Sequence, residues 1–195
     1  MKKLKLFFSV LMFLFVSVGQ IWATDAVYTF TSKSWAATLN GSAANWTSGK
    51  DGGGFSNNGV QVTTNATGAN ATSPASFSNI SKIVVTYNTN KSKGAGSIAI
   101  QIGNNTATTN SVAYSGSADG TSAKFTTQFD YATPQTGNVK ITANTTTNSI
   151  YVVSIAITYS AGGGGQQQPT VFLTPFFGAF WVILDYRIQN HRIYT

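Results

Sequence analysis

The chain has 195 residues, of which 9% are charged, and it contains no cysteine, no glutamate and a single histidine. This composition excludes a disulfide framework, a cysteine-based zinc site and a thiol nucleophile, and it leaves most acid–base chemistries without their usual groups. The net charge is +7, but no basic run and no arginine occurs in residues 24–161, so we expect no nucleic-acid partner.

Residues 1–23 have the pattern of a secretory signal peptide. Three lysines precede an apolar stretch at residues 6–18, and the small residue Ala23 ends the segment. The alternative is an uncleaved membrane anchor, but the apolar stretch is shorter than the roughly 20 residues that a membrane-spanning helix needs. We therefore expect cleavage near Ala23, a secreted or cell-surface location, and no membrane span in the mature domain. The lack of cystines indicates a bacterial secretory context.

Residues 24–161 have the composition and periodicity of an all-β domain. Thr, Ser and Asn are abundant, and apolar residues alternate with polar ones in short runs. These runs are residues 27–31, 59–64, 81–88, 97–102, 122–129, 137–144 and 149–159. Because turn-forming Gly and Asn clusters separate them, the pattern predicts a jelly-roll-like antiparallel β-sandwich of seven to nine strands.

The last run, residues 149–159, has a distinctive pattern. Ile155 and Ile157 fall on one face, whereas Ile150 and Val152 make the beginning of the run apolar on its other face as well. A strand that is apolar on both faces is buried on both, which predicts a central position in the sheet. We expect the fold to close by bringing the first and last strands together.

Five segments carry a resemblance to a known kind of domain. They are residues 27–35, 46–52, 59–64, 80–90 and 148–159. With these segments, residues 26–160 resemble a β-sandwich module of Bacteroidetes-type secreted multidomain surface proteins. The resemblance implies the sandwich fold and a position beside other extracellular domains of the same polypeptide. It implies no activity and no site residues.

The composition changes after the predicted sandwich. Residues 162–170 are rich in Gly and Gln, which is typical of a flexible linker. Residues 171–195 begin with an apolar stretch that Pro175 and Gly178 interrupt, and this stretch is too short for a membrane helix. Three interpretations remain open: a truncated or out-of-frame start of a second domain, a partly buried or interfacial helix, and a membrane or surface anchor.

Residues 24–161 lack the groups of a recognisable active site. The segment has serines but no histidine to act as their base, and no pattern pairs its four aspartates for glycoside hydrolysis. We therefore expect no enzyme and no cofactor. A single structural calcium ion is an open alternative, with Asp25 and Asp130 as candidate ligands.

The segment 45–59 is the most suggestive part of the sequence for ligand binding. It combines Trp46, Lys50 and Asp51 with several glycines. Sugar sites use an aromatic face, a few polar groups and exposed backbone. The candidate ligand-binding residues are Trp46, Lys50, Asp51, Trp35, Asn45 and Asn57. In the competing interpretation, both tryptophans close the ends of the sandwich and the glycines only form turns.

Two functions follow from these observations. The first is a non-catalytic secreted module that binds glycans, most plausibly neutral ones because the predicted surface is rich in Thr, Ser and Asn. The alternative is a structural or adhesive spacer domain of a cell-surface protein, with no small ligand. An exposed tryptophan beside Lys50 and Asp51 favours the first, and two buried tryptophans favour the second.

Overall fold

The computed structural model describes residues 23–90, 93–115 and 124–160. The described residues form eleven strands and one short 3₁₀ turn, η1 (Thr64–Ala66), which confirms the predicted all-β sandwich class. The predicted linker and tail, and the predicted signal peptide apart from Ala23, lie outside the described residues. The strands are β1 (Ala23–Phe30), β2 (Ala37–Leu39), β3 (Ser42–Ala43), β4 (Thr47–Lys50), β5 (Gly54–Ser56), β6 (Gly59–Val62), β7 (Ala69–Thr89), β8 (Ala95–Ile102), β9 (Thr108–Ala113), β10 (Phe125–Thr147) and β11 (Ile150–Ser160).

The structure has more strands than the seven to nine that the alternation predicts. The additional strands β2, β3, β4 and β5 are only two to four residues long, too short to show a period of two. The alternation also does not predict β9, because Val112 is its one buried residue and its other side chains are polar or small. Conversely, β10 unites two predicted runs, residues 122–129 and 137–144, and β7 extends the predicted run 81–88 back to Ala69.

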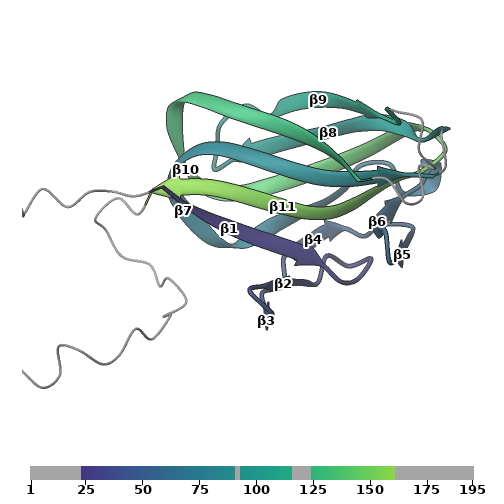
Figure 1. The fold of residues 1–195 in the computed structure, drawn as a ribbon, viewed down its shortest axis with the longest axis horizontal. Helices are drawn as coiled ribbons and strands as arrows, with labels where there is room; N and C mark the ends of the chain where they lie inside the picture. Colours follow the sequence, from purple (N-terminus) through teal and green to yellow (C-terminus); the bar gives the residue numbers. More distant parts are fainter. Residues whose placement is uncertain (1–22, 91–92, 116–123, 161–195) are drawn as a thin grey trace, which may run out of the picture. The chain divides into compact units, whose positions relative to one another are not determined.

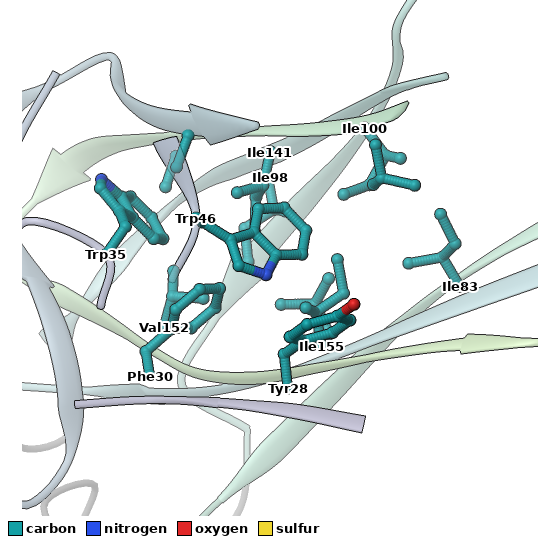
Figure 2. Packing of buried hydrophobic residues seen from close by; sticks show 14 of the residues in the cluster. Tyr28, Phe30, Trp35, Trp46, Ile83, Ile98, Ile100, Ile141, Val152 and Ile155 are labelled. Atoms are coloured by element: carbon teal, nitrogen blue, oxygen red, sulfur yellow. The ribbon is translucent and has the colours of Figure 1, made fainter. Parts of the chain in front are cut away.

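Antiparallel pairing joins the strands in the order β3-β2-β1-β11-β7-β10-β8-β9. Strands β7 and β10 pair along most of their lengths, and their register shifts between Asp130 and Lys140. On one side of these shifts β7 also pairs with β11. On the other side β7 pairs with β4, and β10 pairs with β8. Side chains from both halves, such as Ile83 and Ile141, meet in one core, so the two halves form opposing layers (Figure 2).

Strand β11 is central, as its sequence pattern predicts. It pairs with β7 on one side and with β1 and β6 on the other. The register shifts between Val152 and Ser154, and this irregularity changes which alternate residues face inward. Ile150 and Ile155 are both fully buried although they differ in parity along the strand.

The first and last strands pair, which confirms the expectation that the fold closes in this way. Their register runs from Ala23 opposite Ser160 to Thr29 opposite Ser154. The chain therefore enters and leaves the sandwich at the same end, which we call the terminal end (Figure 1). The opposite end contains Phe30 of β1 and Ile150 of β11, and we call it the distal end.

Candidate functional site

The two candidate tryptophans lie in the core. Trp35 is 0% exposed and Trp46 is 3% exposed. The ring of Phe30 meets both of them edge to face, with centroid distances of 5.1 Å to Trp35 and 5.6 Å to Trp46. Tyr28 meets Trp46 in the same manner at 5.5 Å, and Figure 2 shows the four rings gathered beside Val152 and Ile155. Neither indole offers a face to a ligand, so the expectation of a surface aromatic platform at Trp35 and Trp46 is wrong.

Both tryptophans are buried because β1 supplies aromatic partners for their indoles. Tyr28 and Phe30 point inward at alternate positions of β1, and a buried tryptophan removes about 150–250 Å² of largely apolar surface from water. Trp35 has a left-handed backbone with φ of 62°, which is costly for a residue with a side chain. The Nε1–H of Trp35 donates to the backbone oxygen of Lys50 at 3.0 Å. Burial and this hydrogen bond together offset the backbone cost.

Three of the polar candidates in this segment have structural partners. The Oδ1 atom of Asn45 accepts a hydrogen bond from the backbone N–H of Ala37 at 3.2 Å. The ammonium group of Lys50 donates to the backbone oxygen of Thr67 at 2.6 Å. The hydroxyl of Ser48 donates to Asp51 Oδ1 at 2.5 Å. These contacts attach the segment to its neighbours.

The fourth polar candidate, Asn57, is exposed in the turn between β5 and β6. Because the rings of Trp35 and Trp46 are buried, Asn57 does not share an exposed ligand surface with them. The structure therefore does not bring the six candidate residues together around one exposed ligand surface.

The glycines of this segment serve packing and turn formation. A Cβ atom on Gly52 would lie 2.6 Å from the Val60 side chain, and one on Gly59 would lie 2.3 Å from the backbone oxygen of Val152. Gly59 also has a φ of 111°, a conformation that side chains disfavour. These close approaches explain the glycines without a ligand.

The two candidate calcium ligands lie on one row of the sheet but far apart. Asp25 is opposite Thr158, Thr158 is opposite Lys82, and Lys82 is opposite Asp130. Three strand spacings separate the aspartates by about 14 Å, whereas calcium holds its oxygen ligands at about 2.3–2.6 Å. Asp25 and Asp130 therefore cannot bind the same ion.

Each of these aspartates instead accepts local hydrogen bonds. Asp25 Oδ1 accepts from the Thr158 hydroxyl at 2.5 Å, and both carboxylate oxygens of Asp130 accept from Gln128 Nε2 at 2.9 Å. Across residues 23–90, 93–115 and 124–160, no three His, Cys, Asp or Glu side chains gather into a metal-binding group.

The titration of the tyrosines reflects burial. Burial raises the pKa of Tyr131 to about 12, and its hydroxyl is buried without a hydrogen-bond partner among the described residues. Burial also raises the pKa of Tyr28, with a smaller contribution from the nearby Tyr159. These phenols are neutral at physiological pH.

One group of neighbouring lysines was not apparent from the sequence. Lys33, Lys50, Lys93 and Lys124 are far apart in the chain, yet all four are exposed and lie in or beside connections at the distal end. The sequence carries no signal common to the four lysines, because Lys33 follows one predicted run, Lys124 lies within another, and Lys50 and Lys93 belong to none. Grouping them requires the strand order, which the sequence alone does not give.

The comparisons with known proteins identify no family for this chain. No family model matches it, and no curated protein matches it. Among solved structures, the chain is similar to one described as "Structure of infectious bursal disease virus Gx strain", with 18% sequence identity and a TM-score of 0.25. The similarity covers 72% of this chain and 33% of that chain, so this chain spans about a third of the other's length. A TM-score of this size supports no inference about function.

No helix in the described part of the chain is long and apolar enough to cross a membrane.

Proposed function

We propose that residues 24–161 form a non-catalytic structural and adhesive module of an extracellular surface protein. The observation that supports this proposal is the burial of Trp35 and Trp46, whose rings pack against Tyr28 and Phe30. The segment that best resembled a sugar site is used to close the sandwich. The alternative function, a glycan-binding module, loses its aromatic platform.

The positions of Ala23 and Ser160, where the chain enters and leaves the sandwich, support an adhesive role over that of an in-line spacer. Ala23 and Ser160 are paired neighbours, so the sandwich is attached at one end. A spacer domain in a stiff stalk adds most to the length of the stalk when its two ends lie far apart. A domain attached at one end can contact a partner with its opposite end.

The test is a titration with neutral oligosaccharides, including gluco-, manno-, xylo- and galacto-oligosaccharides, followed by NMR amide shifts. We expect no saturable shift at millimolar concentrations. The matched variant is Phe55→Ala, because Phe55 is 42% exposed and stands beside Asn57 in the β5–β6 hairpin. Saturable binding that disappears in this variant would contradict the proposal and restore the glycan-binding function with a different aromatic residue.

The same preparation tests the absence of catalysis. We expect no release of reducing ends from polysaccharides and no hydrolysis of p-nitrophenyl esters. Turnover that stops in an Asp51→Asn variant would show that the protein is an enzyme.

A further inference from the structure

Four exposed lysines lie around the distal end, and we call them the distal lysines. Lys33 lies between β1 and β2, Lys50 ends β4, Lys93 precedes β8, and Lys124 immediately precedes β10. The strand register places these four positions at the end of the sandwich that is opposite Ala23 and Ser160.

Two of the distal lysines belong to one neighbourhood. The backbone N–H of Gly52 donates to the backbone oxygen of Lys33 at 2.8 Å. The Trp35 indole, two residues from Lys33, donates to the backbone oxygen of Lys50. The connections that carry Lys33 and Lys50 are therefore held against each other.

The chain segments that carry the other two distal lysines both contact Tyr114. The backbone N–H of Tyr114 donates to the backbone oxygen of Gly94, which follows Lys93. The Tyr114 ring packs against Phe125, which follows Lys124, with a centroid distance of 5.7 Å. The chain segments with Lys93 and Lys124 are thereby fixed on either side of one aromatic residue.

A series of hydrogen bonds joins the two neighbourhoods across the distal end. The Lys50 ammonium donates to the Thr67 backbone oxygen, and the Thr67 hydroxyl donates to the Thr145 backbone oxygen at 3.5 Å. The Thr145 hydroxyl in turn donates to the backbone oxygen of Ala95 at 3.2 Å, two residues after Lys93. These contacts connect the segments that carry the distal lysines at one end of the sandwich.

The charges of the described residues are divided unevenly between the two ends. The distal end has four lysines and one aspartate, Asp51, which gives +3. The remaining described charges are two lysines, Lys82 and Lys140, and two aspartates, Asp25 and Asp130, which cancel. The whole net charge of the described side chains is thus at the end away from the chain attachment.

We propose that the distal end binds an acidic polysaccharide through these lysines. The proposal rests on the adhesive function above and supplies its partner. Exposed ammonium groups on one surface attract a carboxylated or sulfated polymer over distances of about a Debye length. Many weak contacts along one polymer then act together.

Two other polyanions suit this surface less well. No arginine occurs in residues 24–161, so the bidentate grip that arginine gives on phosphate is missing. Interfacial attachment to an anionic membrane needs apolar side chains beside the basic ones. Among the described residues, Val27 and Phe55 are the exposed large apolar side chains, so the distal end offers a membrane only Phe55 from this set.

The experiment measures binding of the full chain to immobilised polygalacturonate at low and high sodium chloride, with neutral dextran as the control polymer. The distal variant is Lys93→Gln/Lys124→Gln. The matched variant is Lys82→Gln/Lys140→Gln, which removes the same charge elsewhere. We expect the distal variant to bind about 4- to 30-fold more weakly, from about 0.4–1 kcal/mol for each of the two exposed ion pairs that it removes. The matched variant should change less than about 2-fold, and salt should weaken wild-type binding.

Three results would overturn the inference. They are equal weakening in both variants, no binding to polygalacturonate, and tighter binding to phosphatidylglycerol vesicles than to the polymer. Failure of this inference is distinguishable from failure of the proposed function. Saturable binding of a neutral oligosaccharide at Phe55 contradicts the proposed function, whereas absence of binding to polygalacturonate contradicts only the acidic partner.

Discussion

Replacement of Trp35 by alanine should destabilise the sandwich severely. The side chain is 0% exposed, and removal of a buried aromatic residue costs about 3–5 kcal/mol. An independent estimate agrees: about 200 Å² of buried surface at about 25 cal/mol per Å² gives about 5 kcal/mol. The variant also loses the edge-to-face contact with Phe30 and the hydrogen bond to Lys50, while alanine retains the unfavourable left-handed backbone. A loss of this size is a large part of the 5–15 kcal/mol that typically stabilises a domain.

The assay is urea unfolding followed by far-ultraviolet circular dichroism, which does not depend on the removed fluorophore. Trp35→Phe keeps a ring against Phe30 but lacks the indole donor, so we expect a smaller loss of about 1–2 kcal/mol. Phe55→Ala is the exposed aromatic control, and its loss should be below about 0.5 kcal/mol. If Trp35→Ala costs less than about 1 kcal/mol, the indole does not pack in the core and the reasoning fails.

The remaining predictions concern the central strand, the buried phenol and metal dependence. Ile155→Ala and Ile157→Ala should each cost about 2–5 kcal/mol in urea unfolding, because both are fully buried in β11, and small losses at both would refute the assignment of the inward face. Tyr131 ionises near pH 10 when unfolded but at about 12 when folded, so its contribution to stability is complete below pH 10 and is lost as the pH rises towards 12. In Tyr131→Phe, the free energy of unfolding should fall less steeply between pH 10 and 12 than in the wild type. The same dependence on pH in both proteins would refute the raised pKa of Tyr131. EDTA should leave the melting temperature unchanged, and a decrease that calcium reverses would reveal a structural ion.

The regular strands could be predicted from the sequence because one face of each is buried. In β8, Ile98, Ile100 and Ile102 are all buried while their neighbours are not, and this produces a clear period of two. The short strands of residues 37–56 could not be predicted in this way. They are held by pairing and by the two tryptophans, which are tertiary effects that leave no periodic pattern.

The position of a side chain relative to the surface was harder to predict than its place in a strand. Trp46 is followed by polar residues and glycines, a context equally typical of a binding loop and of a segment that closes a core. The outcome depends on Tyr28 and Phe30 of β1, which the sequence does not place beside Trp46. Likewise, Lys33 and Lys124 share one end of the sandwich only because β1, β11, β7 and β10 are neighbours in the sheet.

The central claim is that this module contacts its partner through the distal lysines, with Trp35 and Trp46 confined to the core. The most direct measurement is one ¹H–¹⁵N NMR titration of the full chain with oligogalacturonate. We expect the amide resonances of Lys33, Lys93 and Lys124 to shift together in a salt-dependent manner, while the Trp35 and Trp46 indole N–H resonances stay unchanged and exchange slowly with solvent. Indole resonances that shift on titration and exchange rapidly, with the distal lysine amides unmoved, would contradict the account.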